Sequence, residues 1–173
     1  MDIHNIIGFL DESSPETTSN SQRLWSFNKP VIIKNTSKYR ANSFGFYSYN
    51  GESVIEIYAN SKQESVCDFL KKIRKANKLN EIVIILDNFN SHKTVCVSCI
   101  SAIFKIHLIY LPPYSPQYNP IEKIWKALKK EISRLFIQNQ EDLKDKIRFY
   151  FLEKAKNLSY CTNWMKEFTN IKI

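Results

Sequence analysis

The chain has 173 residues, 43% of them hydrophobic, and a chain of this length can bury roughly 70% of its unfolded surface within one domain. Lys and Arg outnumber Asp and Glu by 25 to 17, a net charge of +8 that favours a polyanionic partner such as nucleic acid, although a lysine-rich surface also serves solubility alone. No apolar run reaches the roughly 18 residues of a membrane span, and the first five residues lack the basic start of a signal peptide, so we expect a cytoplasmic protein without a membrane partner.

The first part of the chain has the pattern of an antiparallel sheet. A strand-like run ends at Asp11 and Glu12 and is followed by a polar loop over 13–22. Further on, Asn50-Gly51 separates two strand-like runs and is a strong hairpin signal. The strands expected here cover residues 3–10, 24–27, 31–33, 44–49 and 53–58.

Helices and strands alternate in the second part of the chain. The elements expected there are helices over about 63–78, 94–104, 120–136 and 141–158, strands over 82–86 and 106–111, and a short segment near Trp164. This alternation implies parallel strands joined by crossover helices. We therefore expect a single α/β domain over 1–173, in which a mixed sheet of antiparallel and then parallel strands is flanked by helices.

Cysteine usage excludes one class of protein and leaves another open. The four cysteines are too sparse for the disulfide framework of a small secreted domain. His92, Cys96 and Cys99 have the spacing of a partial zinc site, but they lie beside an apolar helical stretch and no second ligand pair follows. We therefore do not expect zinc.

Carboxylates fall at the ends of three expected elements. Asp11 and Glu12 end the first strand, and Asp87 directly follows the apolar strand Ile82–Leu86. Glu122 lies in the first turn of a helix, 34 residues after Asp87. Phosphodiester chemistry can use two divalent ions roughly 4 Å apart, and two Asp at adjacent strand ends with a nearby Glu would suffice to bind them. The chain has no P-loop, dinucleotide-binding turn, G-x-S-x-G or H-E-x-x-H motif that would indicate another chemistry.

The start of the helix that carries Glu122 has two interpretations. Asn119 is a good N-cap, Pro120 suits the first helical position, and Glu122 then falls at the third, where negative charge favours the helix dipole. Because Asn119-x-x-Glu122 is close to a capping box, the glutamate could be purely structural. The alternative is a metal ligand.

The same helix is expected to carry a basic face. Its apolar residues from Ile121 to Phe136 form one broad face directed to the core, and Glu122 shares the solvent side with lysines. A solvated charged face is the common explanation, but one sign of charge dominates here, which favours phosphate contact. The expected DNA-binding residues are His92, Lys93, Lys123, Lys126, Lys129 and Lys130.

Two blocks strongly resemble the catalytic domain of DDE transposases of the Tc/mariner superfamily and its prokaryotic insertion-sequence relatives. The first is Leu-Asp-Asn-Phe-Asn-Ser-His at 86–92, and the second is Leu-Pro-Pro-Tyr-Ser-Pro-Gln-Tyr-Asn-Pro-Ile-Glu-Lys-Ile-Trp-Lys at 111–126. The segment Phe9–Ser13, followed by Trp25, resembles the first-aspartate segment of that family. The interval of 34 residues between Asp87 and Glu122 also matches a recurrent spacing in the family.

This resemblance implies a ribonuclease H-like fold in which Asp11, Asp87 and Glu122 bind two Mg²⁺ or Mn²⁺ ions. It implies cleavage at terminal inverted repeats and attack of the freed 3′ hydroxyl on target DNA, commonly at a TA step, within a homodimer in a prokaryotic, nucleoid-associated setting. We expect Asp11 rather than Glu12 as the ligand, because side chains alternate along a strand and the family pattern aligns with Asp11. His92 matches a family histidine that could orient substrate or fix the turn, although a packed structural role is equally consistent.

The sequence departs from this family at its N-terminus. Full-length relatives carry helix-turn-helix modules that recognise the inverted repeats, whereas the first catalytic strand here is expected at about Ile3. End recognition would then come from an upstream reading frame joined by frameshifting, from a separate subunit, or be lost in a truncated, non-catalytic DNA-binding remnant. Another ribonuclease H-like nuclease, such as an RNA–DNA hybrid hydrolase, is disfavoured by the Pro-rich block.

Overall fold

The structure is a computed structural model that describes residues 5–17, 27, 35, 37–113 and 115–168. The strands are β1 (Ile6–Ser13), β2 (Asn42–Ser48), β3 (Val54–Tyr58), β4 (Ile82–Leu86) and β5 (Ile106–Tyr110). The helices are α1 (Gln63–Ala76), α2 (Val95–Ile103), α3 (Ile121–Ile132), α4 (Gln140–Ala155) and α5 (Ser159–Phe168). The strands expected over 24–27 and 31–33 lie outside the described residues, apart from Phe27, which is in a bend.

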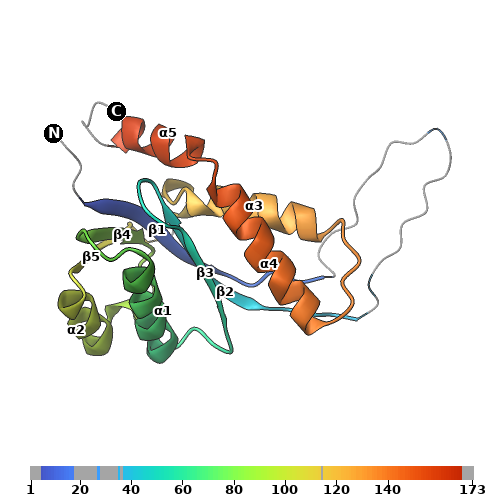
Figure 1. Cartoon of the computed structure of the whole chain (residues 1–173), viewed down its shortest axis with the longest axis horizontal. Coiled ribbons are helices and arrows are strands. Elements are labelled where there is room, and N and C mark those ends of the chain that lie inside the picture. Colours follow the sequence, from blue (N-terminus) through green and yellow to red (C-terminus); the bar gives the residue numbers. More distant parts are fainter. Residues whose placement is uncertain (1–4, 18–26, 28–34, 36, 114, 169–173) are drawn as a thin grey trace.

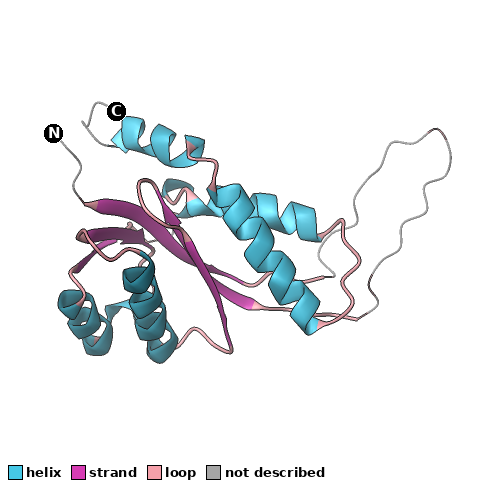
Figure 2. Ribbon diagram, in the orientation of Figure 1, coloured by secondary structure: helices cyan, strands magenta, loops and turns pink. Residues whose placement is uncertain are grey.

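The strands form one mixed sheet in the order β3-β2-β1-β4-β5 (Figures 1 and 2). β1 pairs antiparallel with β2, which pairs antiparallel with β3 through the expected hairpin. On its other side β1 pairs parallel with β4, and β4 pairs parallel with β5. The mixed sheet predicted from the sequence is therefore confirmed, with β1 at its centre.

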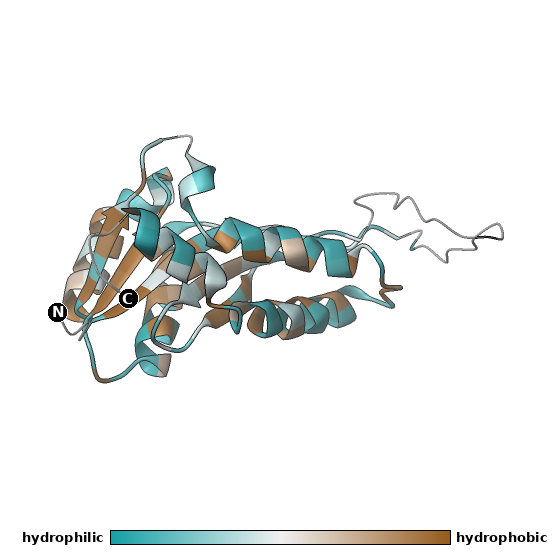
Figure 3. Ribbon diagram, turned by 90° about the horizontal axis from the view of Figure 1, so that it is seen from above, coloured by the Kyte–Doolittle hydropathy of each residue, from teal (hydrophilic) through white to brown (hydrophobic). Residues whose placement is uncertain are grey.

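Helices cover both faces of the sheet because its strands are apolar on both sides. Leu10, Phe44 and Phe46 pack with α1 and α2 on one face. Phe9 and Tyr47 pack with α3, α4 and α5 on the other. Figure 3 shows largely hydrophobic strands flanked by helices that mix hydrophilic and hydrophobic residues. No helix in the described part of the chain has the length and apolar character to cross a membrane.

Helix α3 ends four residues earlier than expected. Ile121, Ile124 and Trp125 are buried as predicted, but the helix stops at Ile132 and Phe136 is 57% exposed. The expectation that Phe136 faces the core was wrong. Ile137 is buried in its place, since the chain turns there to begin α4 after the N-cap Asn139.

Candidate active site

The sheet register places two of the predicted carboxylates at the same end of neighbouring parallel strands. Leu10 of β1 lies opposite Leu86, the last residue of β4, so Asp11 in β1 and Asp87 directly after β4 are the next residues along the two chains. Glu122 lies in the first turn of α3, which packs against β1. Three elements that are distant in sequence therefore bring their acidic residues to one end of the sheet.

These three carboxylates line one pocket of about 580 Å³. The turn after β4 and the Pro-rich segment after β5 supply the rest of its wall. The other lining residues are Asn88, Phe89, Asn90, Lys93, Leu111, Pro112, Pro113, Ser115, Pro116 and Asn119. The two blocks singled out in the sequence thus line the same pocket.

Strand alternation separates Asp11 from Glu12. Phe9 packs against the α3 and α4 layer and Leu10 against the α1 layer, so Asp11 and Glu12 follow them onto opposite faces. Asp11 lines the pocket, whereas the structure does not place Glu12 among the pocket residues. Burial and the nearby carboxylates of Glu122 and Asp87 raise the pKa of Asp11 to about 8. This concentration of acidic groups favours a bound cation.

Glu12 instead belongs to an ion-pair bridge behind the pocket. His92 is 2% exposed, and its Nε2 donates to Oε1 of Glu12 at 2.9 Å. Its Nδ1 lies 3.0 Å from Oδ1 of Asp87. Burial alone would lower the pKa of His92, but Asp87 and Glu12 outweigh it and raise that pKa to about 9. The pKa of Asp87 is lowered by its contact with His92, so Asp87 stays ionised.

This placement distinguishes the two roles considered for His92. A buried imidazole held between two carboxylates fixes the turn after β4 and is not exposed for contact with DNA. The bridge to Glu12 could not be read from the sequence, because it joins residues 80 positions apart.

The expected N-cap of α3 was wrong. The helix begins at Ile121, Pro120 occupies the cap position, and no side chain caps it. The side chain of Asn119 is turned away from the helix, and its Nδ2 donates to the backbone carbonyl of Leu10 at 3.2 Å. A long-range hydrogen bond therefore replaces the local cap, and it ties the start of α3 to the residue before Asp11.

Helix α5 braces the Pro-rich segment from outside. Trp164 packs edge-on against Phe9 with ring centroids 5.0 Å apart, and its indole Nε1 donates to the carbonyl of Tyr118 at 2.7 Å. The sequence alone predicts only a short segment near Trp164. The signal that could have identified its role was an aromatic residue whose polar N–H needs a partner when it is packed.

Residues 7–144 match the family described as DDE superfamily endonuclease, which is most of the chain. This chain belongs to that family. Over 78 residues, or 43% of the chain, it is 36% identical to the insertion element IS630 uncharacterized 39 kDa protein of Shigella sonnei. Those residues cover 23% of the Shigella protein, so the match spans a small part of its length.

Solved structures of the Mos1 mariner transposase share the fold of this DDE family member. The mariner Mos1 paired end complex with Mg superposes with a TM-score of 0.70 at 14% identity, over 93% of this chain and 51% of that one. The separate catalytic domain of Mos1 superposes with a TM-score of 0.63 at 13% identity, over 95% and 80% of the two chains. The expected ribonuclease H-like fold is thereby confirmed, and the chain spans about half the length of the complete Mos1 chains.

One of the lysines predicted to contact DNA lines the pocket of this DDE domain, and the other four lie on α3, the helix that carries Glu122. Lys93 lines the pocket itself, and its Nζ lies 5.6 Å from the ring centre of Tyr110. Lys123 is exposed and lies over the ring of Tyr160 at 5.5 Å. The remaining three, Lys126, Lys129 and Lys130, are exposed along α3. Burial and Asp87 raise the pKa of Glu122, and the positive charge of Lys129 opposes this rise.

The ligand atoms of the pocket are oxygens, the type that hard divalent cations prefer. Its ligands are carboxylates, and three Asn side chains add amide oxygens to the pocket wall. Oδ1 of Asn119 and Oδ1 of Asn88 are buried and, among the described residues, have no hydrogen-bond partner. No three His, Cys, Asp or Glu side chains in the described ranges stand close enough to enclose a single ion. Mg²⁺ commonly takes one or two carboxylates and completes its shell with water and phosphate oxygens, which suits this spacing.

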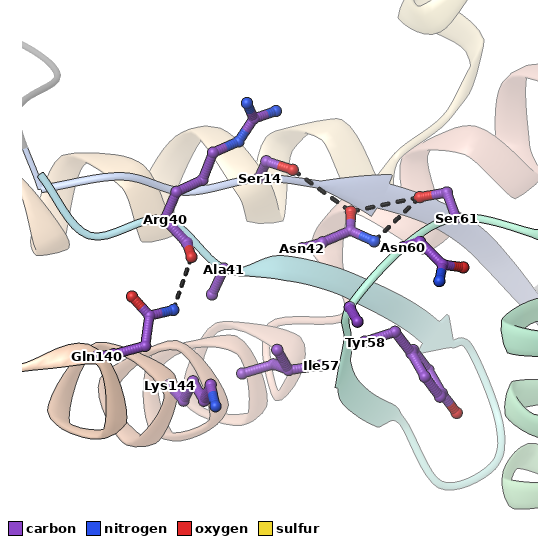
Figure 4. A pocket seen from close by; sticks show the side chains of 11 residues that line it. Ser14, Arg40, Ala41, Asn42, Ile57, Tyr58, Asn60, Ser61, Gln140 and Lys144 are labelled. Atoms are coloured by element: carbon purple, nitrogen blue, oxygen red, sulfur yellow. Dashed lines mark hydrogen bonds between the residues drawn. The ribbon is translucent and has the colours of Figure 1, made fainter.

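A second cavity, of about 610 Å³, lies at the same end of the sheet but has no catalytic carboxylate (Figure 4). Its polar groups largely bind one another. Asn42 forms hydrogen bonds with the hydroxyls of Ser14 and Ser61, and Gln140 donates to the carbonyl of Arg40 at 2.7 Å. The acidic pocket is therefore the candidate active site.

Proposed function

We propose that this domain is the catalytic part of a metal-dependent DNA transposase. It would cleave DNA at the ends of a mobile element and transfer the freed strand into target DNA. The observation that carries the proposal is the meeting of Asp11, Asp87 and Glu122 in one pocket, each presented by a different element. Membership of the DDE superfamily endonuclease family supports the same chemistry.

In this proposal Asp11, Asp87 and Glu122 hold two Mg²⁺ or Mn²⁺ ions. Bound in this way, divalent ions supply an activated water or hydroxyl and stabilise the leaving oxygen. The protein contributes fixed positions for the ligands. The His92 bridge keeps Asp87 ionised and in place, and the Asn119 contact sets the start of α3 and hence the position of Glu122.

DNA is the proposed partner. The net charge of +8 and the exposed lysines of α3 supply a surface for phosphates beside the pocket. Mos1 structures include a paired-end complex with the left transposon end and a strand transfer complex. By analogy we propose a homodimer on paired ends. Because the chain spans about half of those Mos1 chains, we also propose an upstream helix-turn-helix unit, either fused by frameshifting or separate.

The test is DNA nicking on a supercoiled plasmid that carries the DNA flanking the gene on both sides. Wild-type protein should nick this plasmid with Mg²⁺ or Mn²⁺ and not with EDTA. Asp87→Asn and Glu122→Gln should each abolish nicking, whereas Glu141→Gln, at an exposed position of α4, should not. Undiminished nicking in both pocket variants would exclude the proposed metal site. DNA binding without cleavage in the wild type would favour a non-catalytic remnant.

A further inference from the structure

The acidic pocket contains an aromatic side chain that the proposed metal chemistry does not use. Phe89 follows Asp87 by two residues, lines the pocket with the carboxylates, and is 53% exposed. Its one aromatic contact among the described residues is with His92, edge-on at 6.0 Å between ring centres. A large apolar ring left this open beside charged groups loses the free energy that burial would give.

The backbone holds Phe89 in place. Its N–H donates to Oδ1 of Asp87 at 3.3 Å, and its carbonyl accepts from the N–H of His92 at 3.1 Å. His92 is itself fixed between Asp87 and Glu12. The ring is thus carried on a constrained turn, so that ordering a ligand against it costs less conformational entropy.

The groups around Phe89 have the chemistry of a nucleotide site. Asn88 and Asn90 flank it in sequence and line the same pocket, and amide groups can donate to and accept from the edge of a base. Oδ1 of Asn88 is buried there without a hydrogen-bond partner among the described residues. Lys93 adds a positive charge suited to a phosphate. The pocket is also lined by Pro112, Pro113 and Pro116, which are apolar and rigid.

We propose that Phe89 is a stacking platform for one unpaired DNA base next to the phosphate held at the carboxylates. The inference rests on the proposed function in taking DNA as the substrate and in taking the carboxylates as the cation site that holds its phosphate. Every base has a π-face, so stacking on an aromatic ring tolerates any sequence and contributes about 1–3 kcal/mol per base. Enzymes that do chemistry on a base extrude its nucleotide and stack it against aromatic or apolar side chains, and an exposed ring beside the pocket could hold an unpaired base in the same way.

The test is a binding cycle with single-stranded DNA in Ca²⁺, read by fluorescence anisotropy. The probes are a fluorescein-labelled thymine ten-mer and a sugar–phosphate ten-mer that lacks bases. Phe89→Ala should weaken binding of the thymine ten-mer about tenfold and leave binding of the base-free strand unchanged. Phe89→Trp should bind the thymine ten-mer at least as well as the wild type. Phe149→Ala provides the control, because Phe149 is an exposed phenylalanine on α4 that does not line the pocket.

Each outcome bears on one claim. Equal loss on both probes, no loss in Phe89→Ala, or the same loss in Phe149→Ala would overturn the stacking site. The plasmid nicking assay decides the proposed function separately, since binding in Ca²⁺ requires no cleavage. If the protein did not nick DNA but Phe89→Ala weakened binding of the thymine ten-mer alone, the stacking site would be supported and the proposed function would not.

Discussion

Asn119 and Leu10 are joined by a hydrogen bond between elements 109 residues apart in sequence. Nδ2 of Asn119 donates to the carbonyl oxygen of Leu10 at 3.2 Å, and Asn119 is 5% exposed. A carbonyl can only accept, so this contact fixes the orientation of the amide and leaves Oδ1 as its other polar atom. Because Leu10 precedes Asp11 and Asn119 precedes the helix of Glu122, one hydrogen bond sets the relative position of two proposed metal ligands.

Replacing Asn119 by Asp should therefore reduce activity more than stability. The carboxylate cannot donate to Leu10, so the start of α3 loses its anchor and Glu122 shifts relative to Asp11. A displacement of about 1 Å can cost about 100-fold in rate, whereas a lost buried hydrogen bond costs about 1–3 kcal/mol of stability. We expect nicking to fall by 10- to 100-fold, measured at a temperature where urea denaturation shows the variant folded.

Asn139→Ala is the matched control for this variant. Asn139 caps α4 by accepting from the N–H of Asp142 at 2.9 Å, and losing such a cap costs about 1 kcal/mol. Nicking should be unchanged. If Asn139→Ala reduced nicking as much as Asn119→Asp, the loss would reflect general destabilisation and not the anchor.

Local signals predicted most of the fold and the three acids. The hairpin at Asn50-Gly51 and the apolar strand before Asp87 follow from turn chemistry and periodicity, which depend on nearby residues. The positions of Asp11, Asp87 and Glu122 at the ends of elements indicated that they lie close together, because parallel strands end at the same edge of a sheet.

Features that depend on long-range contacts could not be predicted from the sequence. Asn119 is a residue type that often caps helices, but its side chain instead binds the carbonyl of Leu10, 109 residues away. The Glu12–His92 bridge joins residues 80 positions apart. Beyond the end of α3 at Ile132, the N–H of Ile137 donates to Oδ1 of Asn35, which is also distant in sequence. The exposed ring of Phe89 could not be predicted either, since an aromatic residue after a strand is more often buried.

Gly45 should be required for the position of α3. It lies opposite Asp11 in the sheet register, and a Cβ there would come within 2.6 Å of Phe151 and 2.7 Å of Trp125. Gly45→Ala should destabilise the fold by about 1–3 kcal/mol and also lower nicking, because Trp125 belongs to the helix that carries Glu122.

Gly8→Ala separates these two effects. A Cβ at Gly8 meets Phe46, which packs in the α1 layer on the other face of the sheet. Gly8→Ala should therefore destabilise the fold but leave the nicking rate of the folded protein unchanged. The two variants are compared at equal folded fraction, measured by circular dichroism. Equal activity in the two variants would show that the position of α3 does not depend on Gly45.

His92→Ala should destabilise the protein far more than a comparable surface change. Removing the buried imidazolium leaves the carboxylates of Glu12 and Asp87 without their positive partner, and breaking such a bridge lowers the free energy of unfolding by several kcal/mol. Since Asp87 is about half exposed, we expect the free energy of unfolding, measured by urea denaturation, to fall by about 2–3 kcal/mol. His107→Ala is the control, because His107 lies at the same 2.9 Å from Glu81 but both side chains are exposed. Its effect should stay below about 1 kcal/mol, and similar effects in the two variants would argue against a structural bridge at His92.

Asp11→Asn should stabilise the metal-free protein and remove its response to metal. Asp11 is partly buried beside the carboxylates of Glu122 and Asp87, so replacing it by a neutral side chain relieves desolvation and repulsion. We expect unfolding in EDTA to require about 1–2 kcal/mol more than for the wild type. Mg²⁺ or Mn²⁺ should raise the melting temperature of the wild type and not of this variant. Asp145→Asn, at an exposed position of α4, should keep the metal response. A metal response that persists in Asp11→Asn would remove Asp11 from the ligand set.

The exposed lysines of α3 should determine the salt dependence of DNA binding. Contacts to about six phosphates would give a log–log slope of affinity against salt near −5. Replacing Lys126 and Lys130 by Ala should make this slope shallower by about 2, because each lost phosphate contact removes about 0.9. Lys71 and Lys75 are exposed on α1, on the other face of the sheet, and their replacement by Ala removes the same charge. If both double variants shifted the slope equally in a filter-binding titration, net charge and not the α3 face would explain the binding.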